Sequence, residues 1–209
     1  MLIDNVKVFG QNSIRINSSK IIYIDPLYID QNYNDADFIL ITHDHYDHFS
    51  PDDISKLIKN DTIIIMPEKM RSVASKLNLG ANNVEFVVPN QMYHIGALSF
   101  KTVPSYNITK TFHPKSNNWV GYILDLDKKY YVAGDTDNVP EIRMIECDVA
   151  FVPIGGTYTM NYKEAAELIN TMQPRLVIPV HYGTIVGEKA DGERFRNMLE
   201  PSIECQLMI

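Results

Sequence analysis

The chain has 209 residues, of which 45% are hydrophobic and 22% are charged. This composition is typical of a compact globular protein and argues against intrinsic disorder. The formal net charge is −7, whereas a broad nucleic-acid surface presents clusters of Lys and Arg to the phosphates. We therefore expect a single domain spanning residues 1–209 that does not bind nucleic acid.

Features that the sequence lacks indicate the cellular location of the protein and the side chains that could bind a metal. No stretch approaches the roughly 18 consecutive apolar residues of a membrane span, and the N-terminal residues do not resemble a secretory signal. We expect a cytoplasmic protein with no membrane span. The two cysteines, Cys147 and Cys205, fit neither a disulfide framework nor a paired-cysteine zinc motif. Any metal site must therefore use His and carboxylate side chains.

The first part of the chain predicts an antiparallel opening and then a buried strand. Residues 6–10, 13–16 and 21–25 are short β-rich runs, and the polar residues 17–20 form a turn between the last two. Residues 37–42, "DFILIT", are almost continuously apolar, as expected for a strand covered on both faces. This strand leads directly into a cluster of histidines.

Two helices are expected in the region that follows. Ser50, Pro51 and Asp53 fit the N-cap, first and third positions of a helix that reaches about Lys59. After a strand over 62–67, a second helix is expected from about Glu68 to a stop at Gly80. Its apolar residues recur at helical spacing: Met70, Val73, Ala74 and Leu77.

The second half of the chain is rich in strands. The candidates are residues 84–89, 96–104, 119–127, 129–137, 147–156 and 175–183. Asp127 and Lys128 form the turn of a hairpin, and Asn161 and Glu164 cap a helix. A polar helix near 193–199 and a short strand end the chain. Both halves place strands before a strand–helix–strand unit, which predicts two sheets stacked face to face with helices outside.

The segment "HDHYDH" carries the strongest functional signal. It contains His43, His45, Asp47 and His48, three of the six histidines in the chain. On an extended loop, residues two apart face the same way, so His43 and His45 can bind one cation while Asp47 and His48 turn toward a second. The alternative is a solvated polar loop, although histidines rarely cluster without a function.

Four side chains on one loop cannot complete two metal sites, so further ligands are expected at other strand ends. Asp135 follows the strand "YYVAG", where Gly134 allows a close approach of the backbone, and its carboxylate could bridge two cations. His181 follows the strand "LVIPV" in the same manner. Taken singly, Asp135 could instead cap a turn and His181 could be a hydrogen-bonded structural residue.

With these residues the sequence resembles the metallo-β-lactamase-fold hydrolases over nearly the whole chain. The motifs that carry the resemblance stand in the family's order and approximate spacing: "IDP", "THDHYDH", "AGDTD", "DVAFVPIGG", the pair Thr159 and Met160, and "IPVHYG". The resemblance implies an α+β fold, a four-layer αβ/βα sandwich with two mixed sheets face to face and helices outside. The chain looks most similar to a small, insertion-poor branch related to ascorbate-phosphate lactonases and N-acyl-phosphatidylethanolamine phospholipases.

One ligand of the family has no direct counterpart here. Such enzymes place another histidine soon after the strand represented by "LSFKTVPSYN", where this chain has Tyr106 and Asn107. We expect His113, six residues beyond Asn107, to fold back into this position; the alternative is a site with one nitrogen ligand fewer. His94 lies in a turn before a strand and is expected to be structural.

The resemblance and the ligand types together predict the chemistry. Imidazole and carboxylate suit two divalent metal ions, with Zn(II) expected and Mn(II) or Fe(II) as alternatives. Paired cations lower the pKa of a bound water toward about 7 and supply a nucleophile at neutral pH; Asp47 would both bind a metal and orient that water. We expect hydrolysis of a small, anionic or polar ester, lactone or phosphodiester.

Other functions and the assembly stay open from the sequence. A nuclease, or a non-catalytic metal-binding or interaction protein of the same fold, is the alternative to small-molecule hydrolysis. Tyr106, Lys110, Tyr158 and Tyr182 could contact a substrate. A homo-oligomer is compatible with the sequence.

Overall fold

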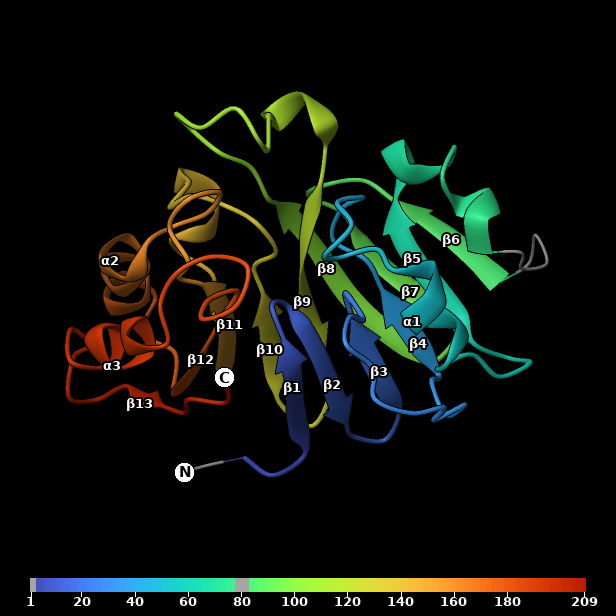
Figure 1. The fold of residues 1–209 in the computed structure, drawn as a ribbon, viewed down its shortest axis with the longest axis horizontal. Helices are drawn as coiled ribbons and strands as arrows, with labels where there is room; N and C mark the ends of the chain where they lie inside the picture. The colour runs from blue at the N-terminus through green and yellow to red at the C-terminus, as the bar shows by residue number, and fades with distance from the viewer. Residues whose placement is uncertain (1–2, 78–82) are drawn as a thin grey trace.

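The computed structural model describes residues 3–77 and 83–209, which form two β-sheets packed face to face (Figure 1). The first sheet has the order β1-β2-β3-β4-β5-β6. Its strands are β1 Val6–Gly10, β2 Ser13–Asn17, β3 Ile21–Ile24, β4 Phe38–Leu40, β5 Ile63–Pro67 and β6 Val84–Val87. The first three strands are antiparallel, and β3 to β6 are parallel.

The second sheet is also mixed and has the order β13-β12-β11-β10-β9-β8-β7. Its strands are β7 Met92–Ile95, β8 Leu98–Pro104, β9 Val120–Asp125, β10 Lys129–Val132, β11 Val149–Pro153, β12 Leu176–Val180 and β13 Glu204–Cys205. Strands β7 to β10 are antiparallel, and β10 to β13 are parallel.

Helices cover the outer faces of both sheets. Helix α1, Pro51–Ser55, lies against the first sheet, whereas α2, Tyr162–Met172, and α3, Ala190–Arg196, lie on the opposite side of the molecule against the second (Figure 1). Short 3-10 helices occur at Glu68–Met70, Ala74–Leu77, Lys115–Asn117 and Pro140–Ile142. The layers therefore run helix, sheet, sheet, helix, and the expected α+β sandwich is confirmed.

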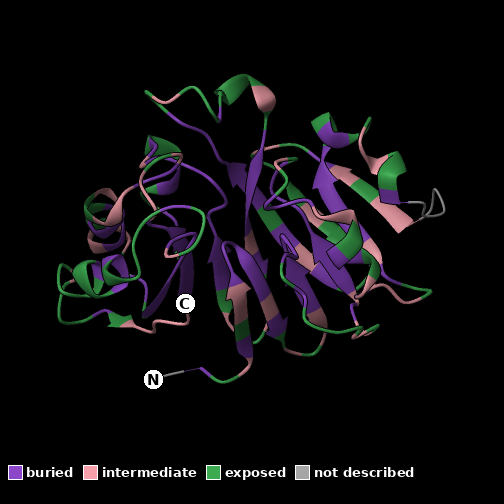
Figure 2. Ribbon diagram, viewed as in Figure 1, coloured by how far each residue is buried: buried purple, intermediate pink, exposed green. Residues whose placement is uncertain are grey.

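The alternation of side chains along the strands explains this layering. Ile22 and Ile24 of β3 pack between the sheets, while Tyr23 points outward into the cluster beneath α1. In β10, Tyr130 likewise packs between the sheets and Tyr131 packs beneath α2 and α3. Because successive side chains of a strand face opposite sides, each sheet supplies two apolar faces. Figure 2 shows the resulting buried strands between partly exposed helices.

Two local expectations were wrong in detail. Ser50 caps α1 as expected, but the helix ends at Ser55 because Leu57 N donates to Ile54 O, a tighter i to i−3 bond that ends the α-helical pattern. Residues 68–77 form two 3-10 segments instead of an α-helix. Met70 and Leu77 are buried as expected, because the two 3-10 segments also turn these side chains toward the core. The expected stop at Gly80 lies outside the described residues.

Two further boundaries differ from the expectation. His94 belongs to strand β7, where it pairs with Ser99 of β8, and not to a turn. Helix α3 begins at Ala190, three residues earlier than predicted, and includes Gly192. A Cβ atom at Gly192 would lie 2.6 Å from the Tyr182 hydroxyl, so the close packing of this helix requires glycine. Glycine is unfavourable inside a helix, and its presence therefore argued against a helix at this position in the sequence.

The fold brings several loops to one edge of the sandwich. Strands β4, β10, β11 and β12 end at this edge, and β9 begins there. In open sheets, ligands bind in the crevice outside the carboxyl ends of parallel strands. Within the described ranges, no helix is both long enough and apolar enough to cross a bilayer.

Candidate metal centre

The loop after β4 presents four of the predicted ligands. The amides of His48 and Phe49 both donate to the carbonyl of His45, at 3.0 and 2.9 Å, which folds the loop into a tight turn. His43 and His48 are almost fully buried, with exposed fractions of 1% and 0%. The turn brings the side chains of the loop together, and the ring centroids of His43 and His48 lie only 4.0 Å apart.

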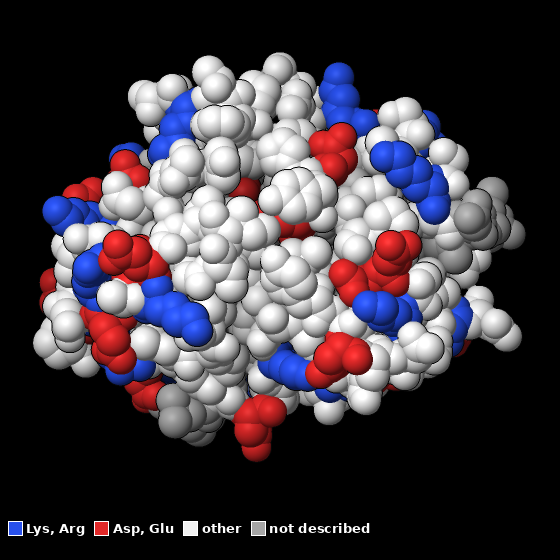
Figure 3. Space-filling model, viewed as in Figure 1, with Lys and Arg blue, Asp and Glu red and all other residues white. Residues whose placement is uncertain are grey.

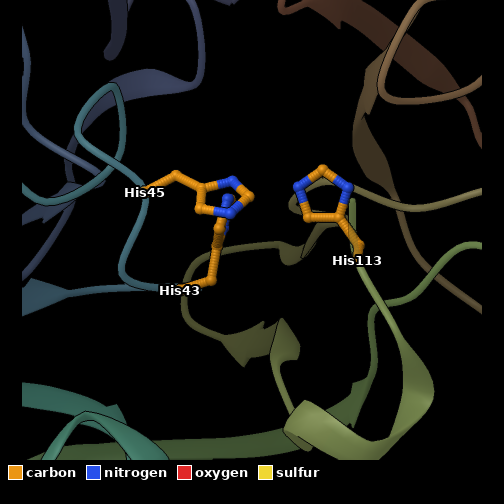
Figure 4. Close-up of side chains that lie close together, drawn as sticks. All are labelled: His43, His45 and His113. Carbon is orange, nitrogen blue, oxygen red and sulfur yellow. The ribbon is translucent and has the colours of Figure 1, made fainter. Parts of the chain in front are cut away.

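His43, His45 and His113 form a first group of three imidazoles (Figure 4). The ring centroids lie 4.6 Å apart for His43 and His45, 5.1 Å for His43 and His113, and 4.9 Å for His45 and His113. Figure 4 shows His113 facing the other two rings from the opposite side. The structure thus places His113 beside the first pair of histidines, as the sequence suggested.

Asp47, His48 and His181 form a second group. Oδ2 of Asp47 lies 3.3 Å from Nε2 of His181 and 3.7 Å from Nε2 of His48. His181 follows β12 with a φ of 55°, a left-handed conformation that turns its side chain back over the strand end. Its amide donates to the carbonyl of Gln11 at 2.9 Å, which fixes this conformation.

Asp135 lies between the two groups. One carboxylate oxygen is 3.3 Å from Nε2 of both His113 and His181, and the other is 3.3 Å from Nε2 of His48. Gly134 has a φ of 64°, and a Cβ atom there would lie 3.1 Å from the Cβ of Thr42. The glycine therefore allows β10 to approach the β4 loop closely enough for Asp135 to reach both groups.

The hydrogen bonding of these side chains is incomplete in a way that fits metal ligands. Over residues 3–77 and 83–209, eight buried polar side-chain atoms lack a hydrogen-bond partner. Five of them belong to this centre: His43 Nε2, His48 Nε2, His113 Nε2, Asp135 Oδ1 and His181 Nδ1. His181 faces the centre with Nε2, 3.3 Å from Asp47 and Asp135, so the other four unpaired atoms are the ones that converge. Because unpaired buried polar atoms are costly, the convergence of these four indicates an additional positively charged partner. The donor set of imidazole nitrogens and carboxylate oxygens fits divalent transition metals.

Both carboxylates of the centre are held in the ionised form. Burial acts to raise the pKa of Asp47, but the hydrogen bond from His181 and the charge of His48 outweigh it and lower the pKa to about 2. Burial likewise opposes ionisation of Asp135, yet His181 and His48 hold its pKa well below the usual range. Two negative charges therefore stand at the core of the site, ready to neutralise cations.

The pKa values of the buried histidines His43 and His48 shift in opposite directions. Burial, together with the neighbouring His48, lowers the pKa of His43 well below its ordinary value, so its ring is neutral and can donate a lone pair. Burial also disfavours charge on His48, but Asp135 and Asp25 outweigh burial and raise its pKa. A positive charge is thus favoured on His48, and a divalent cation bound to its Nε2 would take the place of the proton.

Asp25 supports the centre from behind, and its role was not anticipated beyond the "IDP" motif. Its buried carboxylate accepts four hydrogen bonds, from Asn12 Nδ2, Thr42 N, Thr42 Oγ1 and His48 Nδ1, at 2.6–2.7 Å. The bond from His48 Nδ1 directs Nε2 toward Asp135. The only sequence signal was a carboxylate that ends a buried strand.

Gln11 was also missed by the sequence analysis. Its Nε2 lies 3.3 Å from Asp47 Oδ2 and 3.3 Å from His181 Nε2, and its Oε1 accepts from Thr184 at 2.7 Å. Gln11 sits in the turn between β1 and β2, far from these partners in the chain, so no local pattern could have indicated it.

Asn107 and His113 occupy different places in one clamped loop. Asn107 Oδ1 accepts from both the backbone amide and Nδ1 of His113, at 3.1 and 2.9 Å, and Asn107 N donates to the His113 carbonyl at 2.7 Å. Nε2 of His113 faces Asp135. Asn107 therefore stands behind the ring as its support, in the way that Asp25 stands behind His48.

A pocket of about 270 Å³ opens directly onto the centre. Tyr158 lines it, whereas the other proposed substrate contacts are engaged elsewhere. Tyr106 donates to Glu141, Lys110 pairs with Asp137 at 2.5 Å, and the Tyr182 hydroxyl is buried against Gly192. His94 bonds to Ser99 on β7 and does not enter the site.

Comparisons with known proteins agree with this architecture. Residues 5–181 match the family model described as the β-lactamase superfamily domain. A relative from Pyrococcus abyssi, named as a metal-dependent hydrolase, is 31% identical and the alignment covers 93% of this chain and 91% of the relative. A Methanosphaera stadtmanae protein of the same name is 32% identical over 95% of this chain and 92% of its own.

A solved structure extends the likeness to three dimensions. The crystal structure of a protein from Parabacteroides distasonis matches with a TM-score of 0.83 at 30% identity, covering 97% of this chain and 91% of that one. The family match over residues 5–181, the relatives and this structural match identify the chain as a member of the β-lactamase superfamily.

Proposed function

We propose that this protein is a metal-dependent hydrolase that cleaves an ester, lactone or phosphodiester bond in a small molecule. Two divalent cations, with Zn(II) as the expected metal, would be held by two groups of side chains. The first group is His43, His45 and His113, the second is Asp47, His48 and His181, and Asp135 would bridge them. The names of the relatives as metal-dependent hydrolases support the reaction type.

One observation carries the proposal more than any other. Four buried atoms from both sheets converge without hydrogen-bond partners, namely Nε2 of His43, His48 and His113 and Oδ1 of Asp135, and the Asp135 carboxylate lies 3.3 Å from three histidine nitrogens. A purely structural cluster would satisfy these atoms internally. When bound, the cations would lower the pKa of a water and polarise the scissile carbonyl or phosphoryl oxygen.

The remaining roles fall to the chain's own side chains. Asp47 is 8% exposed and lines the pocket, so its carboxylate can accept a hydrogen bond or a proton from an attacking water. Gln11 and His181 hold Asp47 from the other side, at 3.3 Å each, and so fix its orientation. Tyr158 stands at the pocket wall, where it contacts the body of a substrate.

Hydrolysis of generic substrates tests the proposal. Zinc-loaded protein should hydrolyse p-nitrophenyl esters, simple lactones or bis(p-nitrophenyl) phosphate, and chelation should abolish the activity until metal is restored. Asp47→Ala should lower kcat by roughly 100-fold or more, because general acid–base groups commonly contribute 10²–10⁴-fold. Fully metallated protein that hydrolyses none of these, yet binds a macromolecule tightly with or without metal, would favour the interaction-protein alternative.

A further inference from the structure

The pocket above the metal centre combines a polar floor with an apolar upper part. The floor consists of the side chains of the centre: His45, Asp47, His113 and Asp135. The other lining residues, which we call the apolar rim, are Tyr46, Phe112, Tyr158 and Ile185. None of the described residues that line the pocket is Lys or Arg. Figure 3 shows a hollow near the middle of this face, with acidic atoms at its bottom and mainly uncharged atoms around it.

The apolar rim is exposed to an extent that needs an explanation. Tyr46 is 72% exposed, Phe112 is 47% exposed and Ile185 is 37% exposed. Large apolar side chains that gather around a cavity gain free energy when a ligand removes them from water. Single exposed apolar residues elsewhere on a surface carry no such meaning.

The rim is also built rigidly, because the same contacts that hold the centre hold its loops. Phe112 packs edge-to-face on Tyr158 with ring centroids 4.6 Å apart, and Asn107 Nδ2 donates to the Tyr158 carbonyl at 2.9 Å. Asp137 pins the start of the Phe112 loop by accepting from the Ile108 amide at 2.9 Å. These contacts hold the aromatic pair at the mouth before any ligand arrives.

The loop of Ile185 is anchored in the same way. Thr184, its neighbour, donates to Gln11, the residue that also contacts Asp47 and His181. Tyr46 lies inside the metal-binding loop itself, between His45 and Asp47. The backbone segments that carry the rim are therefore fixed relative to the metal centre.

The charges near the pocket disfavour a second anionic group on the substrate. Lys110 is paired with Asp137, and Lys115 is paired with Glu141 at 2.6 Å. A carboxylate or phosphate outside the reacting bond would therefore face apolar surface and lose hydration without compensation. This departs from the expectation of an anionic or polar substrate that the cations alone suggested.

From these observations we infer that the apolar rim selects neutral esters or lactones that carry an uncharged alkyl or aryl group beside the scissile bond. The inference rests on the proposed hydrolase function and specifies its substrate class. The pocket volume of about 270 Å³ lies just below the range of roughly 300–1,000 Å³ of pockets for drug-sized ligands, so the group is small.

A matched series of substrates tests the inference. For zinc-loaded protein, kcat/KM should rise at least about tenfold from p-nitrophenyl acetate to the hexanoate, since a methylene in an apolar pocket is commonly worth 10-fold or more. Mono-p-nitrophenyl adipate, which ends a chain of equal length in a carboxylate, should be at least about tenfold poorer than the hexanoate. Equal kcat/KM for all three esters would overturn the inference.

Variants assign the selectivity to the rim. Phe112→Ala and, on a separate loop, Ile185→Ala should each reduce the hexanoate-to-acetate ratio by about threefold or more while zinc content stays the same. Met144→Ala, which removes an 84% exposed apolar side chain elsewhere, is the matched control and should keep the ratio. Unchanged ratios in both rim variants would overturn the assignment.

A binding measurement separates failure of the rim from failure of the proposed reaction. Calorimetric titrations of zinc-loaded protein would use the free carboxylates hexanoate and acetate, not their esters. Hexanoate should bind at least about tenfold more tightly than acetate, and Phe112→Ala should remove most of that difference. If no ester is hydrolysed but this binding pattern appears, the proposed hydrolysis is wrong and the selectivity assigned to the apolar rim is supported. Equal binding of the two acids would overturn the rim whatever the hydrolysis results.

Discussion

At the residue scale, three histidines of the centre share one arrangement. Nδ1 of His43 lies 3.0 Å from Thr42 Oγ1, Nδ1 of His48 lies 2.7 Å from Asp25, and Nδ1 of His113 lies 2.9 Å from Asn107. An acceptor on Nδ1 fixes the tautomer and leaves the lone pair of Nε2 free for a metal. We therefore expect the supporting residues to affect metal affinity although they would not themselves contact the cations.

Asn107 provides the test at this scale. Asn107→Ala removes the acceptor behind His113, so zinc affinity should fall by roughly 10–100-fold, the usual loss for a supporting residue, and His113→Ala should weaken it further. Competition with a fluorescent chelator measures both constants. His94→Ala, which removes a histidine on β7, is the control and should leave zinc affinity unchanged. An unaltered affinity in His113→Ala, with a loss in Asn107→Ala, would mean that Asn107 and not His113 occupies the ligand position.

At the element scale, local signals position the strands and helices that carry the site. The sequence predicted α2 well, because Asn161 and Glu164 form a reciprocal capping box: Asn161 Oδ1 accepts from the Glu164 amide at 3.1 Å, and Glu164 Oε2 accepts from the Asn161 amide at 2.9 Å. This helix covers β11 and β12, whose ends deliver His181 and the loop of Tyr158.

Loss of this cap should destabilise the fold without touching the centre. Asn161→Ala should cost about 1 kcal/mol, which for a chain of this size lowers Tm by roughly 2–4 °C. Glu167→Ala, an exposed change on the same helix, should stay within about 0.5 kcal/mol. Differential scanning calorimetry of both variants measures the two changes in Tm. Equal melting temperatures for Asn161→Ala and the unaltered chain would show that the cap is energetically unimportant.

Local sequence patterns predict most strands of this fold but not the contacts between residues that are distant in the chain. Period-2 alternation and continuous apolar runs predicted the strands that build both sheets, except β7, because burial decides them locally. Residues 68–77 have helical spacing of apolar side chains, but spacing does not distinguish α from 3-10 hydrogen bonding. The choice between Asn107 and His113 depends on how their loop closes, and the contacts of Gln11 span more than 160 residues of sequence to His181. Only the folded chain brings such residues together.

At the scale of the whole molecule, the centre joins the two sheets. The first sheet supplies His43, His45, Asp47 and His48 from one loop, and the second supplies His113, Asp135 and His181 from three separate segments. The net charge of −7 and the local charges of Asp47 and Asp135 both favour cations at this position, and the local charges contribute most because distant charges are screened. Because Asp135 lies 3.3 Å from histidines of both groups, we expect the two halves of the centre to be interdependent.

The metal content of the chain tests this account most directly. After reconstitution with zinc and removal of excess metal, elemental analysis should give two ions per chain, and Asp135→Ala should lose metal from both groups together because the shared carboxylate is gone. A reproducible content of one ion or none in the unaltered protein, after reconstitution with zinc and with manganese, would contradict the binuclear centre.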